Sequence, residues 1–391
     1  MSVVLFLTRW YPPHSGHFIR DLAEAVSHYT TVCVLTVVPD PSIKFFSLKF
    51  HYCEETEQSI KTVRIRCHQL KSRMFIAGVI NQLFYIISQV RGLLFFLRRK
   101  IKFDLIHVHI LSRTAIVPFF LKLVFRKPFI ITEYWTRYLP ESNSYRGFFR
   151  KKLTARVVRY ADAVIAISDY LKEAMEKEGM TNANFRVIPV AINTGLFTPG
   201  SDPVSQMKKR IIHISTFSDK AKNITGILRA IKELSGHRND FELHLTGGEV
   251  PFTQPAIEYA KQLGLYGNKV FFQGVKFGKD LAEEIRHADF LVMFSNYETF
   301  SVVIQESLSC GKPVIASKTG PLPDLVKEDS GILVSQGNEK ELIEALDFML
   351  DHYQDYDPNQ IHENVENSFG YRIIGKVYSN LYEGLINQWG K

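Results

Sequence analysis

The chain has 391 residues, of which 46% are hydrophobic, 23% charged and 13% aromatic, a composition that excludes a disordered, collagen-like or disulfide-rich protein. At roughly 100–200 residues per domain, this length predicts two or three domains. Lys and Arg outnumber Asp and Glu by 48 to 40, and the resulting charge of +8 favours phosphate-bearing ligands or an anionic surface. Charge alone does not indicate nucleic acid, and we expect no nucleic-acid partner.

Cysteine spacing and apolar stretches bear on where the protein resides. The four cysteines form no CxxC pair and no zinc-type spacing, so we expect free thiols in a reducing cytoplasm: Cys33, Cys53, Cys67 and Cys310. Residues 1–7 are too short for the apolar part of a signal peptide, and no export is predicted. Polar residues interrupt the stretch 74–97, so its uninterrupted apolar runs are shorter than the ~20 residues that a membrane span needs. We therefore expect a cytoplasmic protein without a transmembrane helix.

The first half of the chain alternates short β-branched and aromatic runs with helical patterns. Helices are predicted at 18–27, 153–160 and 169–178, the last with Ser168 as its N-cap. The runs are typical of buried parallel strands: 3–7, 31–37, 62–65, 104–108, 128–132, 163–167 and 186–189. This alternation predicts a doubly wound α/β domain.

A second domain of the same kind follows residues 191–210, which carry Gly, Pro, Ser and basic residues without periodicity, as linkers do. Six further strands are predicted at 211–215, 241–246, 270–273, 290–294, 314–316 and 332–334. The fold class is therefore α/β, with two Rossmann-like doubly wound domains, 1–195 and 196–370, that face a cleft at the strand carboxyl ends. A dehydrogenase or P-loop enzyme ranks lower, because no GxGxxG follows a predicted strand and no Walker loop is present.

The segment 298–317, ETFSVVIQESLSCGKPVIAS, reads as loop, helix, turn and strand. Ser301 is placed to cap the helix, which puts the backbone amides of Phe300 to Val303, including Val302, at a positive dipole end suited to phosphate. Glu298 and Glu306 stand eight positions apart. With Gly311 and Pro313 after it, this pattern resembles the E-x7-E signature of retaining GT-B glycosyltransferases of family 4, rather than two solvent-facing glutamates on an ordinary helix.

The resemblance extends along most of the chain. Residues 8–26, TRWYPPHSGHFIRDLAEAV, resemble the family's first strand, loop and helix, in which Gly16 lets the backbone approach a phosphate or acceptor; a plain tight turn is the alternative. Residues 104–109, 161–171 and 187–199 are similar to other family segments. Tyr134 stands where the family usually has a histidine, and either a sugar contact or a packed aromatic ring fits it. The C-terminal segment 371–391 resembles the family's helix that returns to the first domain.

Residues 213–223, HISTFSDKAKN, resemble the family's phosphate loop. Lys222 matches its lysine, but Thr216 replaces its arginine, so Lys220 or the dipole of the helix after Asn223 must supply more of the positive charge. Lys220 also fits an ordinary solvated turn. Gly247 resembles a glycine that borders the nucleotide.

The resemblance implies that a UDP- or GDP-linked sugar is transferred with retention to a growing glycan or lipid-linked acceptor in cell-surface polysaccharide synthesis, for example of lipopolysaccharide. The first domain would bind the acceptor and the second the donor. Lys222 and the amides at 300–303 would stabilise the leaving diphosphate, Glu298 would contact the sugar and Glu306 the ribose. No cofactor or metal is expected, because the DxD pair Asp355 and Asp357 lies in a polar tract away from a strand end.

Two alternatives remain open: a degenerate nucleotide-sugar-binding subunit, suggested by Thr216 and Tyr134, and a GT-B-fold sugar-nucleotide epimerase or phosphorylase. The predicted helix 73–98 has one apolar stripe with helical spacing, which predicts that most of it is buried: Ile76, Val79, Ile80, Leu83, Ile87, Val90, Leu94 and Leu97. Its additional aromatic residues and basic ends also suit an anionic membrane surface, so peripheral membrane association and simple packing are both open.

Overall fold

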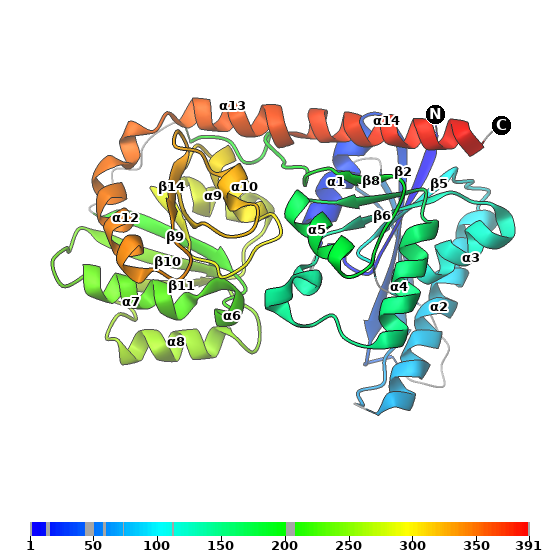
Figure 1. Ribbon diagram of the computed structural model, residues 1–391, viewed down its shortest axis with the longest axis horizontal. Helices are drawn as coiled ribbons and strands as arrows, with labels where there is room; N and C mark the ends of the chain where they lie inside the picture. Colours follow the sequence, from blue (N-terminus) through cyan, green and yellow to red (C-terminus); the bar gives the residue numbers. More distant parts are fainter. Residues whose placement is uncertain are drawn as a thin grey trace. The chain divides into compact units, whose positions relative to one another are not determined.

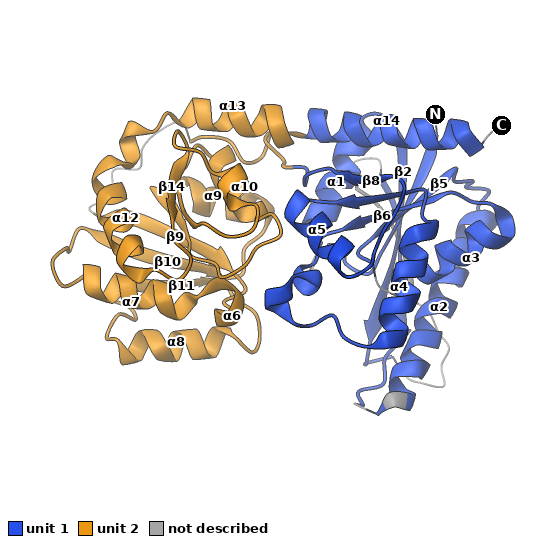
Figure 2. Cartoon of the chain, in the orientation of Figure 1, with its two compact units in different colours: residues 1–191, 371–391 blue, residues 192–370 orange. Residues whose placement is uncertain are grey.

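The computed structural model describes residues 2–12, 16–43, 51–57, 60–72, 74–111, 113–200 and 208–389. The chain forms two compact units: residues 1–191 with 371–391 make unit 1, and residues 192–370 make unit 2 (Figures 1 and 2). The division falls four residues before the boundary expected at 195. Ile192 belongs to unit 2 because its N–H donates to the Phe369 carbonyl at 2.9 Å and it pairs with Gly370.

Unit 1 is built on an eight-stranded sheet with the order β3-β4-β2-β1-β5-β6-β7-β8. Neighbouring strands run parallel except β3, which is antiparallel to β4. The strands are β1 Val3–Thr8, β2 Thr31–Asp40, β3 His51–Glu57, β4 Ile60–His68, β5 Leu105–His109, β6 Phe129–Glu133, β7 Ala163–Ala166 and β8 Phe185–Val187. The central strands are fully buried, as expected for a parallel sheet covered on both faces.

Helices pack on this sheet, and the last one comes from the far end of the chain. They are α1 His17–Ser27, α2 Phe75–Arg98, α3 Ile116–Phe125, α4 Phe148–Tyr160, α5 Asp169–Lys177 and α14 Tyr371–Trp389. The predicted cap of α5 is confirmed, since the Ser168 hydroxyl accepts from the Leu171 N–H at 3.2 Å. Helix α14 lies against α1, where a side chain at Gly375 would meet the Ala25 carbonyl.

Helix α2 contradicts the expectation that its apolar stripe is core. The stripe faces outward: Ile76, Val79, Leu83, Ile87, Val90, Leu94 and Leu97 are 42–62% exposed. The face against the sheet instead carries Ala77, Tyr85, Leu93 and Phe96 together with the fully buried polar residues Ser88 and Gln89. Gly92 permits this packing, because a Cβ there would lie 2.5 Å from a methyl group of Leu35. The helix is apolar on both sides, and helical spacing alone cannot tell which side meets the sheet.

The contact between α1 and α14 makes stability depend on pH. The Tyr371 hydroxyl, with one proton to donate, lies 2.9 Å from an Asp21 oxygen and 3.1 Å from a Glu24 oxygen. Burial raises the pKa of Asp21 to about 7. The folded protein therefore holds a proton that the unfolded chain releases near pH 4, so the free energy of unfolding falls as pH rises from about 4 to 7.

We expect the Asp21→Asn variant to be more stable than the wild type at pH 8, by about 2–4 kcal/mol, and to lose most of this dependence. The asparagine oxygen still accepts from Tyr371 and carries no charge to be buried. Urea unfolding at pH 5 and pH 8 measures the effect. An unchanged slope in the variant would assign the pH dependence to other groups.

Unit 2 has a six-stranded, wholly parallel sheet with the order β11-β10-β9-β12-β13-β14. Its strands are β9 Lys209–Ser215, β10 Phe241–Gly247, β11 Val270–Gly274, β12 Phe290–Met293, β13 Val314–Ser317 and β14 Gly331–Val334. Its helices are α6 Asp219–Lys222, α7 Ile224–Leu234, α8 Thr253–Gln262, α9 Gly278–Arg286, α10 Val302–Ser309, α11 Leu322–Leu325, α12 Glu339–His352 and α13 Pro358–Phe369. Ile211 and Ile212 belong to separate hydrophobic clusters, so helices cover both faces of the sheet.

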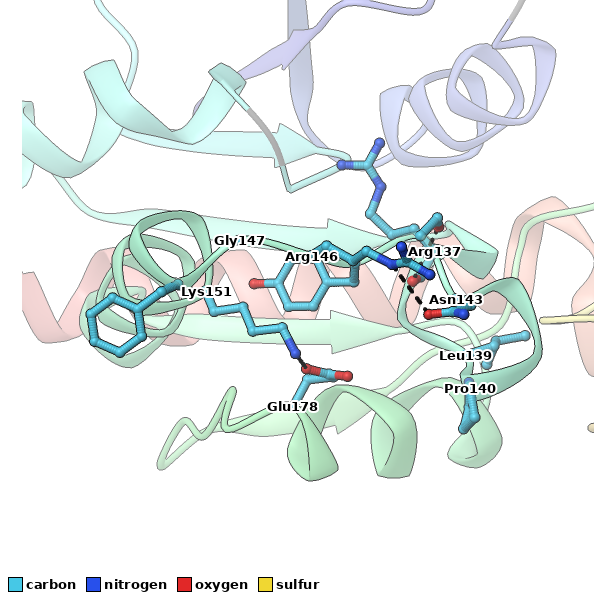
Figure 3. A pocket seen from close by; sticks show the side chains of 11 residues that line it. Arg137, Leu139, Pro140, Asn143, Arg146, Gly147, Lys151 and Glu178 are labelled. Carbon is cyan, nitrogen blue, oxygen red and sulfur yellow. Dashed lines mark hydrogen bonds and ion pairs between the residues drawn. The ribbon is translucent and has the colours of Figure 1, made fainter.

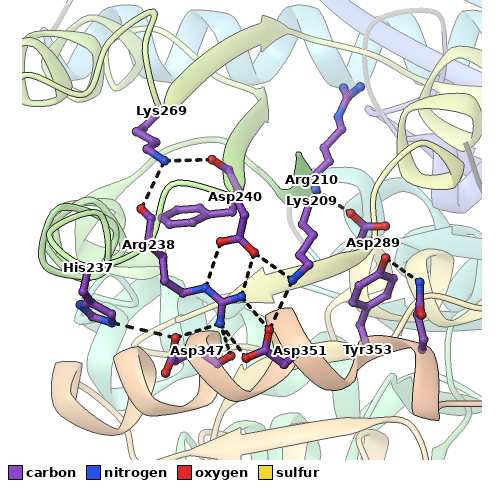
Figure 4. Close-up of polar contacts among 12 residues, drawn as sticks. Lys209, Arg210, His237, Arg238, Asp240, Lys269, Asp289, Asp347, Asp351 and Tyr353 are labelled. Carbon is purple, nitrogen blue, oxygen red and sulfur yellow. Dashed lines mark hydrogen bonds and ion pairs between the residues drawn. The ribbon is translucent and has the colours of Figure 1, made fainter. Parts of the chain in front are cut away.

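A network of charges holds α12 at the amino ends of β9 and β10 (Figure 4). The Arg238 guanidinium donates to Asp240, Asp347 and Asp351 at 2.7–3.0 Å, and Lys209 donates to Asp240 at 2.9 Å. The network lies at the edge of the sheet opposite the strand carboxyl ends. We regard it as structural.

Candidate active site

Each sheet has one point where the strand order reverses, between β1 and β5 in unit 1 and between β9 and β12 in unit 2. Open parallel sheets bind ligands just beyond the strand carboxyl ends at such a point, because the flanking loops there diverge to opposite faces. In unit 2 these are the loop 216–218 with α6, which follows β9, and the loop 294–301 with α10, which follows β12. These segments contain Lys222, Glu298 and Glu306.

Lys222 and Glu298 join the two loops of unit 2. The Lys222 ammonium forms an ion pair with Glu298 Oε1, and the Ser295 hydroxyl donates to the same oxygen at 2.9 Å. Glu298 is 5% exposed, so the pair is shielded from water and its attraction is stronger than that of a surface pair. An ammonium has three N–H donors, and one bond to Glu298 leaves capacity for ligand oxygens.

Asn296 pins the loop that carries Glu298. Its backbone N–H donates to the Ala221 carbonyl at 2.8 Å, and its side-chain amide donates to the Lys220 carbonyl at 3.1 Å. Thr319 and Gln336 donate to the Asn296 carbonyl at 3.1 and 2.7 Å. The ion pair therefore stands on a loop that is bonded on both sides, which favours a preorganised site.

His213 orders the loop after β9, a role that the sequence analysis did not identify. Its Nδ1 donates to the Val292 carbonyl at 2.8 Å, so Nε2 accepts from the Ser215 hydroxyl, also at 2.8 Å. That hydroxyl in turn accepts from the Phe217 N–H at 3.0 Å. Burial lowers the pKa of His213 to about 4, which keeps the ring neutral at physiological pH. A polar residue within the apolar run of β9 was the available signal.

Gly247 packs against this loop. With φ of 110°, it approaches the end of β9 so closely that a Cβ would lie 2.2 Å from the Ser215 carbonyl oxygen. The neighbouring Gly248 N–H donates to that oxygen at 2.8 Å. Only glycine fits here, and the position shapes the loop in which Thr216 lies exposed.

The amino end of α10 differs from the expectation in one respect. Ser301 does occupy the N-cap position, but it adopts φ of 71°, and its hydroxyl accepts no hydrogen bond from the helix. The prediction of a serine cap is therefore wrong, because Ser301 departs from the extended conformation that is typical of an N-cap and its hydroxyl makes no bond to the first turn. Without a side-chain cap, the first amides of α10 and its dipole are suited to an anion.

Three other residues predicted for the site lie at or near the amino end of α10 and differ in their burial. The Phe300 ring is buried against Phe369, at 5.5 Å between centroids, so its side chain is structural and only its backbone belongs to the helix end. Val302 and Glu306 are half-buried. Glu306 lies on the second turn of α10, about one turn after the amides at the amino end of this helix.

The amino end of α7 is already capped, unlike that of α10. Asp219 accepts from the Thr225 N–H at 2.8 Å, and Asn223 accepts from the Gly226 N–H at 3.2 Å. This helix end is therefore an unsuitable replacement for the missing arginine charge. The positive charge nearest to Glu298 comes from Lys222, while Lys220 is exposed.

In unit 1, the two predicted residues take structural positions. Gly16 precedes α1 with φ of 76°, and a Cβ there would lie 2.4 Å from the Trp10 carbonyl oxygen. The Tyr134 hydroxyl bonds His109 Nδ1 at 3.1 Å, and its ring is 8% exposed. Burial raises the pKa of Tyr134 well above its usual range. Of the two interpretations left open for Tyr134, the structure favours the packed aromatic ring.

The acidic residues of the DxD pair serve local structure. Asp355 bonds His352 at 2.9 Å, and Asp357 caps α13 by accepting from the Asn359 and Gln360 N–H groups. Within the described ranges, no group of three or more His, Cys, Asp or Glu side chains is arranged to hold a metal ion.

One cavity of unit 2 does not coincide with this site. A cavity of about 670 Å³ in unit 2 is lined by residues such as Lys209, Arg286 and Lys312, at the amino ends of the strands. Ligands of open parallel sheets bind at the other edge. We therefore place the candidate site at the Lys222–Glu298 pair and the amino end of α10.

Comparisons with known proteins agree with this fold. Residues 52–196 match the sequence model of Glycosyltransferase Family 4, and residues 200–367 match that of Glycosyl transferases group 1. The chain is 26% identical over 268 residues to D-inositol 3-phosphate glycosyltransferase of Corynebacterium jeikeium, covering 63% of this chain and 64% of that protein. It is 26% identical over 203 residues to MMP alpha-(1->4)-mannosyltransferase of Mycolicibacterium hassiacum, covering 51% and 48%.

Solved structures extend the likeness over nearly the whole chain. Sucrose-phosphate synthase from Thermosynechococcus elongatus superposes with a TM-score of 0.79 at 21% identity and covers 99% of both chains. Anabaena HepE in complex with UDP-glucose superposes with a TM-score of 0.74 at 18% identity and covers 98% of this chain and all of that one. The chain spans about half to two thirds of the length of these curated relatives. With a glycosyltransferase family model matched in each half and the fold shared throughout, it belongs to the GT-B glycosyltransferases by sequence family and fold.

Proposed function

We propose that the protein transfers a sugar, with retention of anomeric configuration, from a nucleoside diphosphate sugar to a growing glycan or lipid-linked acceptor in cell-surface polysaccharide synthesis. The observation that carries this proposal is the Lys222–Glu298 pair beside the uncapped amino end of α10 at the point of strand reversal in unit 2. The UDP-glucose complex of the Anabaena protein supports a nucleotide sugar as donor.

The chemistry asks little of protein groups beyond position and charge. The bond between the anomeric carbon and the diphosphate oxygen breaks, and its electron pair leaves on the diphosphate. The acceptor oxygen bonds to the same carbon from the departing side, and its proton passes to the diphosphate. Lys222 and the first amides of α10 stabilise the developing charge, Glu298 orients the sugar and Glu306 binds the ribose.

The proposal includes independence from metal ions. Lys222 and the α10 dipole supply the positive charge that a divalent ion would otherwise bring to the diphosphate. We expect transfer to proceed at an undiminished rate after exhaustive dialysis against EDTA, measured by release of nucleoside diphosphate with an extract of lipid-linked acceptors. Loss of activity that magnesium or manganese restores would contradict the proposed charge assignment.

A binding subunit without turnover is the second candidate function. Thr216 favours it, since this exposed neutral side chain stands where the family resemblance implies an arginine. Tight donor binding without transfer to any member of a broad acceptor panel, and without slow donor hydrolysis, would support this candidate over the transferase.

The acceptor class in this proposal is supported by an apolar face of unit 1 formed by α2, α3 and α4. Helix α3 contacts both α2 and α4 (Figure 1). Beside the outward stripe of α2, large apolar side chains are exposed on the other two helices: Phe120, Leu123, Val124, Phe125, Phe148, Phe149 and Leu153. A soluble helix normally turns its polar side outward, and a continuous apolar surface marks an interaction site.

Charge supports an anionic membrane as the partner of this face. Residues 71–160 carry 18 Lys and Arg against three Asp and Glu, a balance of +15, whereas the whole chain carries +8. Two copies of a face carried by so basic a segment would repel each other, while an anionic membrane leaflet attracts it. We therefore assign the face to peripheral binding of an anionic bilayer.

Helix α2 lies along the sheet. By length and composition alone, the helix at residues 76–98 could cross a bilayer. Among the described residues it is the one helix that meets this criterion. However, α2 packs on β2 and β4 through Gly92 and buries Ser88 and Gln89, so it belongs to the fold of unit 1. Its outward stripe suits contact with the membrane surface.

We expect the protein to float with vesicles that contain phosphatidylglycerol, and to float less in 0.5 M salt, because screening weakens attraction between exposed charges. The double variant Leu83→Glu/Ile87→Glu should reduce the vesicle-bound fraction at least about tenfold. The matched control is Val275→Glu, an equally exposed apolar position in unit 2.

Indifference of the wild type to anionic vesicles would overturn this assignment. So would a concentration-dependent dimer that the double variant abolishes, since that result identifies a second copy of the chain as the occupant.

A further inference from the structure

A second cavity lies at the point of strand reversal in unit 1. It measures about 530 Å³. Arg9 and Trp10 follow β1, Leu111 follows β5, and Trp135 and Arg137 follow β6, so its floor is formed by the carboxyl ends of three neighbouring strands. Its walls come from α2, α3 and α4, the helices that carry the apolar face. The general rule for open sheets identifies this edge as a ligand site.

Three arginines line the cavity: Arg9, Arg137 and Arg150. Within the described part of the chain, no aspartate or glutamate lines it and none of the three arginines forms an ion pair. Arg137 Nε is buried without a hydrogen-bond partner. Burial lowers the pKa of Arg137, while the nearby groups of Tyr138 and Glu133 raise it and the charge of Arg150 lowers it. Three guanidinium groups in one cavity, without an ion-pair partner among the described residues, favour a polyvalent anion.

Aromatic rings hold the arginines in place. Arg137 lies 3.5 Å from the centre of the Trp135 ring, and Arg9 lies 5.3 Å from that of Trp10. The two tryptophans pack edge to face at 4.6 Å. Stacking leaves the planar N–H fork of an arginine free to bind phosphate oxygens.

A buried carboxylate, Glu133, fixes the loops of the cavity. It accepts hydrogen bonds from the Leu111 N–H at 2.8 Å, the Trp135 N–H at 3.0 Å and the Tyr138 hydroxyl at 3.2 Å. Because its oxygens are used in this way, Glu133 preorganises the cavity and is unavailable as a bonded partner for Arg137.

A neighbouring cavity of about 420 Å³ provides an internal comparison (Figure 3). This neighbouring cavity shares Arg137 and Tyr145 with the cavity of about 530 Å³. In the neighbouring cavity, however, Lys151 is paired with Glu178 at 2.5 Å, and Arg146 donates to Asn143 at 3.3 Å. Its charges are largely satisfied within the protein. The excess positive charge therefore belongs to the cavity of Arg9, Arg137 and Arg150.

The remaining wall of that cavity is apolar and comes from Leu111, Ile116, Leu153 and Val157. An arginine cluster beside apolar side chains matches a ligand with a phosphorylated head and a hydrocarbon tail. Leu153 also belongs to the exposed apolar face, so the cavity borders the surface assigned to the membrane.

We propose that this cavity binds the phosphate or diphosphate headgroup of an aliphatic lipid that carries the acceptor. The inference rests on the proposed glycosyl transfer and specifies its acceptor class. Arg9, Arg137 and Arg150 bind the phosphate oxygens, and Ile116, Leu153 and Val157 contact the first part of the hydrocarbon chain.

Farnesyl diphosphate, used below its micelle concentration, tests the proposal through quenching of tryptophan fluorescence, since Trp10 and Trp135 lie in the cavity. We expect saturable binding that weakens about tenfold in Arg150→Gln and in Arg9→Gln, as for loss of one charged hydrogen-bonding group. Arg146→Gln, which removes a charge from the other cavity, should leave affinity within twofold. Arg137→Gln is less suited as a first test because its half-buried side chain also packs on Trp135.

Inorganic pyrophosphate and farnesol separate the sources of affinity. The proposal requires both to bind more weakly than farnesyl diphosphate. Pyrophosphate binding as tightly would indicate a free-anion site, equal binding of farnesol would indicate an apolar pocket, and no effect of Arg150→Gln or Arg9→Gln would place the ligand elsewhere; each result overturns the inference. Binding of nucleoside diphosphate should be unchanged in these variants, so a failed donor assignment in unit 2 would be recognised separately.

Discussion

The Lys222→Met variant is expected to lower kcat about 100-fold to 1,000-fold, the loss usual for one preorganised group that stabilises developing charge. Lys222 is the cation bonded to Glu298 between the loops after β9 and β12, and methionine keeps most of its length and none of its charge. Binding of the intact donor should weaken less than kcat falls, because charge on the diphosphate increases as the sugar departs. Single-turnover transfer and calorimetric donor titration measure the two effects.

Two controls accompany this variant. Lys232→Met removes an exposed charge from the last turn of α7 and should leave the rate unchanged. The double variant Lys222→Met/Glu298→Gln no longer leaves a buried carboxylate without its partner, so it should regain stability and remain inactive. If the single variant loses activity only in proportion to its unfolded fraction, Lys222 is structural.

The two glutamates of the E-x7-E pattern should differ in what they bind. Glu306→Gln removes the charge proposed to strengthen hydrogen bonds to the ribose, so both the donor and free nucleoside diphosphate should bind roughly tenfold more weakly. Glu298→Gln should spare the nucleoside diphosphate and lower the transfer rate, because its proposed partner is the sugar. Calorimetry with donor and diphosphate on both variants makes the comparison. Equal losses of diphosphate affinity would show that Glu298 is wrongly assigned.

The sheets were predictable from sequence because parallel strands covered on both faces are continuous apolar runs. Val4 to Leu7 in β1 and Phe290 to Met293 in β12 are almost entirely buried, as their composition requires. The strand β3 was missed since its sequence, HYCEETE, has three glutamates and pairs only at the edge of the sheet, antiparallel to β4. It was harder to predict which side of a helix faces the sheet than to predict that the helix exists. The spacing of α2 predicted a stripe but could not show that the stripe faces outward.

Short-range patterns identified the candidate site, while its bonding could be seen only in three dimensions. Lys222 and Glu298 are 76 positions apart, and nothing in either local segment indicates that they form a pair. The left-handed conformation of Ser301, with φ of 71°, likewise had no signal in its local sequence. His213 within β9 and Glu133 at the end of β6 were overlooked, although each is a buried polar residue among apolar neighbours, where burial demands a hydrogen-bond partner.

Hydrogen exchange of the wild-type protein with and without nucleoside diphosphates, in EDTA, tests the central claim most directly. Amide protection reports where the ligand binds without requiring knowledge of the sugar or the acceptor. The account predicts that UDP or GDP protects residues 216–223 and 298–306, with the loop after β9 and the first turn of α10 slowed together. Protection confined to unit 1, protection at the amino-end cavity of Lys209 and Lys312, or no protection by either nucleotide would contradict it.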